Sequence, residues 1–171
     1  MTVPRIPRAA IARVPAGTTI VRAERMSPAF TKYHLADGRA LHRFSREEPH
    51  AHPHDHPWPF ETTILDGGYA EEVFRAAEDG NWHSEIVHRD PGTSHWVAAE
   101  HIHRIVALPH GECWTLVRAG AHERETRFWR FGDGVWSRAW HQRRWQRHLP
   151  APKRQVRPNV LIQLSLFSEA N

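Results

Sequence analysis

Short runs of β-branched and aromatic residues recur along most of this chain, separated by turn signals such as LDGG, EDGN, DPGT and PHGE. The runs show partial alternation of apolar and polar residues, which is typical of strands. They lie at residues 18–24, 40–45, 61–65, 69–75, 82–88, 95–98, 103–108, 113–120 and 127–131. No long segment has a helical period, and thirteen prolines and ten glycines favour short elements. The pattern predicts an all-β fold: a β-sandwich, a jelly roll or a barrel.

The chain has 171 residues, enough for one domain with some additional length. Cys113 is its single cysteine, which excludes an internal disulfide and is typical of a reducing compartment, so we expect a cytoplasmic protein. We expect Cys113, beside Trp114, to lie in the core rather than to act as a nucleophile. Arg and Pro interrupt every apolar run of residues 1–17, which predicts no signal peptide. No segment approaches the length of a membrane span.

Basic charge is concentrated at the C-terminal end. Residues 138–171 contain seven Lys or Arg and one acid, Glu169, a net charge of +6 in a chain of +4, so residues 1–137 carry −2. The strand pattern also stops near residue 139. We therefore predict a β domain over 1–138 and a flexible, basic tail over 139–171, with a short helix at 140–149 before a proline-rich linker. Such a tail can bind a polyanion or an acidic surface, or be a solvated linker.

The densest chemistry lies in PHAHPHDHPWPFETTILDGGY, residues 49–69. Its four alternating histidines would share one face of a strand. They are His50, His52, His54 and His56. Some forty residues later, His101 and His103 again have the same parity. Two histidines on one strand, a carboxylate a few residues on and a third histidine on a distant strand can together hold a single metal ion in a β-barrel.

The order HxH–x4–E–x5–GG, followed by PG–x10–HRI, resembles the two sequence motifs of the cupin superfamily over about residues 30–135. The phrases HDHPW, ILDGGY, HxHR and CWTLV look most like small cupin proteins of bacteria and their phages. The resemblance implies a double-stranded β-helix, that is, a jelly-roll barrel. It also implies a metal site made of His54, His56, Glu61 and His103, with His101 in reserve because AAEHIHR departs from the usual second motif.

Ligand type leaves the divalent metal open among Fe, Mn, Ni, Cu and Zn. A cupin that folds without metal is the alternative. We expect His50 and His52 to be solvated or to support the ligands, and the remaining histidines to lie at the surface or in the core. The reaction is also open, with a metal-dependent dioxygenase or isomerase as the enzyme classes that the resemblance suggests.

The pentapeptide QLSLF resembles the peptide by which bacterial replication and repair proteins dock on the DNA sliding clamp. It comprises Gln163, Leu164, Ser165, Leu166 and Phe167. A short extended peptide binds through a few anchors in a preformed pocket, which Leu166 and Phe167 would fill while Gln163 sets the register. The alternative is that residues 160–167 form a last β-strand on the body of the protein.

The basic residues of the tail fit the docking interpretation, because a clamp encircles DNA. The candidate phosphate contacts are Arg143, Arg144, Arg147, Lys153 and Arg154. Trp140 or Trp145 could stack on exposed bases.

Two functions follow from the sequence. The first is a metal-binding cupin, of a bacterium or a phage, that docks on the sliding clamp and acts in DNA replication or repair. The second is a free-standing metal-dependent cupin enzyme on a small molecule, with a structural tail. Neither involves a membrane, and both are compatible with a homodimer.

Overall fold

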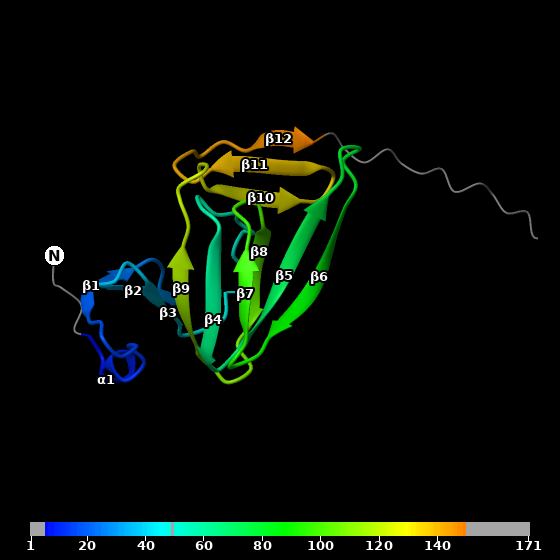
Figure 1. Ribbon diagram of the computed structural model, residues 1–171. Coiled ribbons are helices and arrows are strands. Elements are labelled where there is room, and N and C mark those ends of the chain that lie inside the picture. The colour runs from blue at the N-terminus through cyan, green and yellow to red at the C-terminus, as the bar shows by residue number, and fades with distance from the viewer. Residues whose placement is uncertain (1–5, 49, 150–171) are drawn as a thin grey trace, which may run out of the picture.

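The computed structural model of the chain describes residues 6–48 and 50–149 (Figure 1). The described part is nearly all β, as predicted. Its elements are α1 (Arg8–Ile11), β1 (Ile20–Arg25), β2 (Phe30–Leu35), β3 (Ala40–Phe44), β4 (Phe60–Asp66), β5 (Tyr69–Ala76), β6 (Trp82–Arg89), β7 (Ser94–Val97), β8 (Ile102–Ala107), β9 (Cys113–Ala119), β10 (Arg127–Phe131), β11 (Val135–Ala139) and β12 (Gln146–Leu149). Among these residues, no helix is long and apolar enough to cross a membrane.

Two antiparallel sheets face each other. One has the order β1-β2-β3-β9-β4-β7, and the other has the order β6-β5-β8, which is extended on the β8 side by a bridge between His54 and His103. The chain crosses between the sheets after β4, β6, β7 and β8, so β9 lies between β3 and β4, and β8 pairs with β5 although β6 and β7 come between them in the sequence. This is the pairing of a jelly roll, which confirms the predicted fold.

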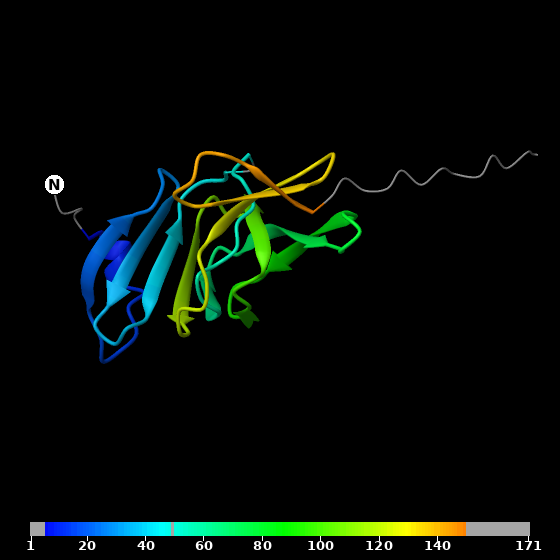
Figure 2. The same cartoon turned by 90° about the horizontal axis from the view of Figure 1, so that it is seen from above.

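A third sheet, β10-β11-β12, lies across one end of the two facing sheets (Figure 1). Viewed from above, β1, β2 and β3 lie on the far side of the molecule from the turn between β5 and β6 (Figure 2). The barrel between β4, β5, β8 and β9 therefore has one end beneath the third sheet, and the histidine-rich segment runs there.

The core has two parts because β9 buries both of its faces. Trp114 packs with Leu41, Tyr33 and α1 on one side, whereas Cys113 packs with Ile64 on the other. Burial raises the pKa of the Cys113 thiol to about 12, so the thiolate is disfavoured at neutral pH. Cys113 is thus a core residue, as expected.

The turn between β4 and β5 requires glycine. Gly67 has φ +79°, and a Cβ added there would lie 1.9 Å from the carbonyl oxygen of Glu112. No side chain fits that space without moving the backbone. The turn places β5 in the opposite sheet to β4.

β2, β11 and β12 were not predicted from the sequence, and the predicted short helix at 140–149 is wrong. Gln146–Leu149 forms β12, which pairs with β11. Arg147 lies over the ring of Trp136 at 4.7 Å, and the rings of His148 and Trp129 are 4.7 Å apart. These cross-strand contacts favour a strand over a helix with no apolar face to bury. The folded part therefore extends beyond residue 138, where we expected it to end.

Candidate metal centre

The segment that carries His54 and His56 is extended but is not a regular strand. His54 exchanges two backbone hydrogen bonds with His103 of β8, at 2.9 and 3.1 Å. The backbone N–H of His56 donates to the carbonyl of Ala99 at 2.9 Å. These bonds hold the segment against β8, so both histidines face the ring of His103.

Asp55, between the two histidines, points the opposite way and anchors the segment. Its buried carboxylate accepts hydrogen bonds from the backbone N–H of Arg127 at 2.5 Å and from Nε1 of Trp129 at 3.1 Å. Arg124 lies 3.1 Å from the same carboxylate. This role was not predicted, and its only signal in the sequence is an acid between two histidines.

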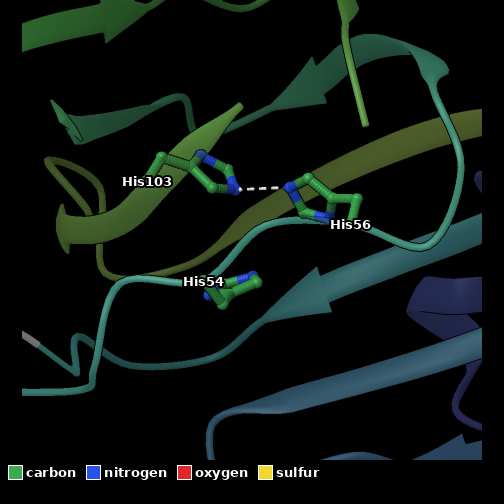
Figure 3. A group of neighbouring side chains, drawn as sticks. All are labelled: His54, His56 and His103. Atoms are coloured by element: carbon green, nitrogen blue, oxygen red, sulfur yellow. Dashed lines mark hydrogen bonds between the residues drawn. The ribbon is translucent and has the colours of Figure 1, made fainter. Parts of the chain in front are cut away.

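His54, His56 and His103 form one cluster of side chains (Figure 3). Their ring nitrogens lie within 4.8 Å of one another, and the Nε2 atoms of His56 and His103 are 3.0 Å apart. Metal–nitrogen bonds of about 2.1 Å place two ligands of one ion roughly 3–4 Å apart. Small ring rotations would therefore bring all three nitrogens to one ion.

The site favours neutral imidazoles. Burial lowers the pKa of His54 to about 3 and the pKa of His56 well below its ordinary value. Both rings therefore carry a free lone pair at neutral pH, which is the form that binds a metal ion.

The carboxylate beside this cluster belongs to Glu71 of β5, which is fully buried. One oxygen of Glu71 accepts from Nε of Arg89 at 2.6 Å, and the other pairs with Nδ1 of His103. Nε2 of His101 lies 3.6 Å from that second oxygen. Burial alone would raise the pKa of Glu71, but the nearby His101 and the hydrogen bonds with His103 and Arg89 outweigh it and hold the pKa well below its usual range.

The sequence contained one signal for Glu71. It stands next to Glu72 in the run YAEEVFR, and two adjacent residues of a strand point to opposite faces. One of the two acids therefore had to face the interior.

Glu61, the acid expected in the site, does not join the cluster, and this expectation is corrected. Glu61 is 41% exposed, and its carboxylate accepts from Nη2 of Arg118 at 2.6 Å. Its neighbours on the other face of β4, Thr62 and Ile64, are buried. The register of β4 turns position 61 outward, and strand parity then excludes it from the barrel interior.

The other histidines divide between surface and interior. His50 and His52 are exposed, and the ring of His52 packs edge-on against Trp145 at 4.9 Å. His101, the reserve ligand, lies beside Glu71. Both ring nitrogens of His95 are buried without a hydrogen-bond partner within the described ranges, and burial lowers the pKa of His95 to about 4.

The basic candidates fall into two groups. Arg143, Arg144 and Arg147 are all exposed, and only Arg147 of the three also lies over the ring of Trp136. Trp145 lies near Arg130 and Arg138, while Trp140 is 62% exposed. Lys153, Arg154 and residues 163–167 lie outside the described residues.

Neither a family model nor a curated protein matches the sequence. Among solved structures, the polyketide cyclase RemF of Streptomyces resistomycificus is 22% identical over 66% of this chain and 82% of its own, with a TM-score of 0.45. A cupin-2 domain protein of Rhodospirillum rubrum is 13% identical over 67% and 74%, with a TM-score of 0.43. Hydroxypropylphosphonic acid epoxidase of S. wedmorenis is 12% identical over 61% and 56%, with a TM-score of 0.42. These likenesses are distant, and the jelly-roll assignment rests on the strand pairing of this chain.

Proposed function

We propose that this protein binds one divalent transition-metal ion through the imidazoles of His54, His56 and His103. The observation that supports the proposal is the convergence of three ring nitrogens, two of them on rings that burial keeps neutral. Imidazole nitrogens suit Fe, Mn, Ni, Cu and Zn, and geometry does not select among them. Three protein ligands leave coordination positions for water or substrate.

The contact between His56 and His103 brings two candidate metal-binding nitrogens together. If Nδ1 of His103 carries the proton that Glu71 accepts, its Nε2 presents a lone pair to Nε2 of His56, 3.0 Å away. The Nε2–H tautomer of a neutral His56 donates a hydrogen bond to that lone pair, and a metal ion between the rings would take the place of this proton, which would move to Nδ1 of His56.

The protein residues around the site would exclude water from one side. The ring of Phe60 packs edge-on against His56 at 4.8 Å, and Phe128 lies 6.4 Å from His54. A bound metal would supply Lewis-acid chemistry toward an oxygen ligand. Dioxygenase or isomerase chemistry on a small molecule remains part of this proposal.

Metal analysis of the purified full-length protein tests the site. After loading with each of the five metals in turn, we expect about one equivalent in the wild type and a loss of tight binding in His54→Ala and His56→Ala. His50→Ala is the matched control, because His50 has the same chemistry but is exposed. A wild-type protein that none of the five metals loads would refute the proposal.

We further propose that residues 163–167 dock on the bacterial DNA sliding clamp. The support is the sequence QLSLF, in which all five positions match the docking pattern. Binding of the full chain to immobilised clamp should be lost in the double variant Leu166→Ala and Phe167→Ala. The double variant Val160→Ala and Leu161→Ala, apolar but outside the pentapeptide, should bind normally. Equal binding by all three proteins, or no binding by the wild type, would exclude docking.

The basic residues that follow β11 would add contacts to the DNA within the clamp. The exposed arginines Arg143 and Arg144 are the best candidates among the described residues, together with Lys153 and Arg154 from the sequence. Replacing Arg143 and Arg144 with Ala should reduce the slope of log DNA affinity against log salt concentration by about two. Arg147→Ala should change the slope less, because its guanidinium already covers Trp136. Metal binding without clamp binding would favour the free-standing enzyme instead.

A further inference from the structure

Glu71 is a fully buried acid whose two oxygens have different partners. Oε1 accepts from Nε of Arg89 at 2.6 Å, and Oε2 pairs with Nδ1 of His103. A buried carboxylate beside a guanidinium stays ionised, because the paired charges stabilise each other and each hydrogen bond is charge-assisted. Oε2 of Glu71, which contacts Nδ1 of His103, is therefore a hydrogen-bond acceptor with no proton to donate.

This acceptor determines which nitrogen of His103 carries the proton. A neutral imidazole has one N–H and one lone pair, and the nitrogen that faces an ionised carboxylate carries the N–H. Nδ1 of His103 is that nitrogen, so its lone pair is on Nε2. Nε2 is also the atom that faces His56 at 3.0 Å. The proton therefore lies on the side of the ring away from the cluster.

We infer that Glu71 is a positioning residue for His103: it holds the Nδ1–H and the ring orientation, and thereby presents the Nε2 lone pair to a metal ion shared with His54 and His56. Arg89 in turn holds the carboxylate of Glu71 in place. The inference rests on the proposed metal site. It adds a residue from outside the cupin-like motif, whose own acid is Glu61.

A competing arrangement uses Glu71 as a ligand. Glu71, His101 and His103 also have donor atoms within 4.8 Å of one another. Two observations oppose a cation there. The guanidinium of Arg89 lies 2.6 Å from the same carboxylate and would repel a second positive charge. Nδ1 of His103 would also have to lose the proton that its contact with Glu71 holds.

Zn²⁺ titration of the full chain, with a competing chelator, distinguishes the two arrangements. For a positioning role, Glu71→Gln should weaken Zn²⁺ binding 10- to 100-fold with one equivalent still bound. His101→Ala should bind within about threefold of the wild type, because a positioning Glu71 does not need it. Glu72→Gln is the matched control, because Glu72 is the adjacent acid and pairs instead with Arg104. Its affinity should equal that of the wild type.

Three results would overturn the inference. The first is an unchanged Zn²⁺ affinity in Glu71→Gln. The second is an equal loss of Zn²⁺ affinity in Glu71→Gln and His101→Ala. The third is a wild type that binds two equivalents of Zn²⁺, one of which is lost in both variants. If Glu71→Gln does not fold, Glu71→Asp keeps the charge but shortens its reach, and it should weaken binding in the same direction.

A metal-free measurement separates this inference from the metal site itself. The ¹⁵N chemical shifts of His103 in the wild-type apoprotein should show the Nδ1–H tautomer. A wild type that takes up no Zn²⁺ but shows this tautomer would refute the metal site and leave the role of Glu71 in orienting His103. The Nε2–H tautomer in the wild type would overturn the inference whether or not zinc binds.

Discussion

The Nε2 atoms of His56 and His103 lie 3.0 Å apart, although 47 residues separate the two histidines in the sequence. The contact arises because the backbone of the preceding histidine, His54, pairs with the backbone of His103. The two rings come from elements that the jelly-roll connections place side by side. A ligand that bridges them would therefore also link distant parts of the chain.

Zinc should raise the thermal stability of the protein through this link. Binding to the folded state alone stabilises it by about 2.7 kcal/mol at a free concentration of 100 times Kd, which corresponds to a rise in Tm of several degrees for a protein of this size. His56→Ala should abolish the rise, whereas His52→Ala, which alters an exposed histidine, should keep it. Differential scanning fluorimetry measures Tm with and without zinc. A rise of equal size in His56→Ala would contradict the proposed ligands.

Asp55 should make a large contribution to the free energy of unfolding. Asp55→Ala leaves the N–H groups of Arg127 and Trp129 without their acceptor, and we expect a loss of about 3 kcal/mol in urea unfolding. Trp129→Phe removes only one of these donors and should cost about 1–2 kcal/mol. Because the two residues share one hydrogen bond, the double variant should lose less than the sum of the single variants.

The matched control is Asp133, an exposed acid that accepts from Nε1 of Trp136 at 3.3 Å. Asp133→Ala should change the free energy of unfolding by less than about 0.5 kcal/mol. Equal losses for Asp55→Ala and Asp133→Ala would mean that burial does not strengthen the Asp55 contacts.

Gly67 and Gly111 provide a test of the turn between β4 and β5. Both have φ +79°, but a Cβ at Gly67 meets the carbonyl of Glu112, whereas nothing lies within 4 Å of a Cβ at Gly111. Gly111→Ala should cost about 1 kcal/mol, the strain of a left-handed alanine. Gly67→Ala should cost about 3 kcal/mol or more, because the backbone must also move. Equal values in urea unfolding would show that the turn relaxes freely.

His42 should make the apoprotein less stable in acid. Burial, followed by the charges of Lys32 and His34, lowers the pKa of His42 to about 3. The unfolded chain takes up this proton near pH 6.5 and the folded chain only near pH 3, so the free energy of unfolding falls as the pH drops through this window. The contribution of one histidine is at most about 1.4 kcal/mol per pH unit.

The variant His42→Phe keeps an aromatic ring beside Phe30 and removes the titration. Urea unfolding in a chelator should show a shallower loss of stability between pH 6 and pH 4 in this variant than in the wild type. Above pH 7 the two pH profiles should run parallel. Profiles that are also parallel between pH 6 and pH 4 would show that His42 is protonated in the folded protein.

The strands that the sequence predicted well are those with a strong local signal. The run YAEEVFR became β5 and the run WHSEIVH became β6, each within a residue or two at its ends. β11 and β12 were missed because their stability comes from contacts between residues such as Arg147 and Trp136, which local sequence does not reveal. The expected helix failed for the same reason.

The sequence by itself determined the class of fold and three members of the candidate site. Alternating runs with glycine turns are sufficient for an all-β chain, and histidines at i and i+2 share a face whether or not a regular strand forms. Pro53, Pro57 and Pro59 prevent a full strand around His54 and His56, yet the segment stays extended enough to keep both rings on the side of His103.

Only the tertiary structure decided which acid accompanies these histidines. Glu61 and Glu71 both lie in strand-like runs, and a shift of one residue in register reverses the face on which a side chain lies. The packing of Thr62 and Ile64 into the barrel turns Glu61 toward Arg118, whereas the pairing of β5 with β8 brings Glu71 to His103. Register is set by contacts between distant strands, and the local sequence around either acid does not contain that information.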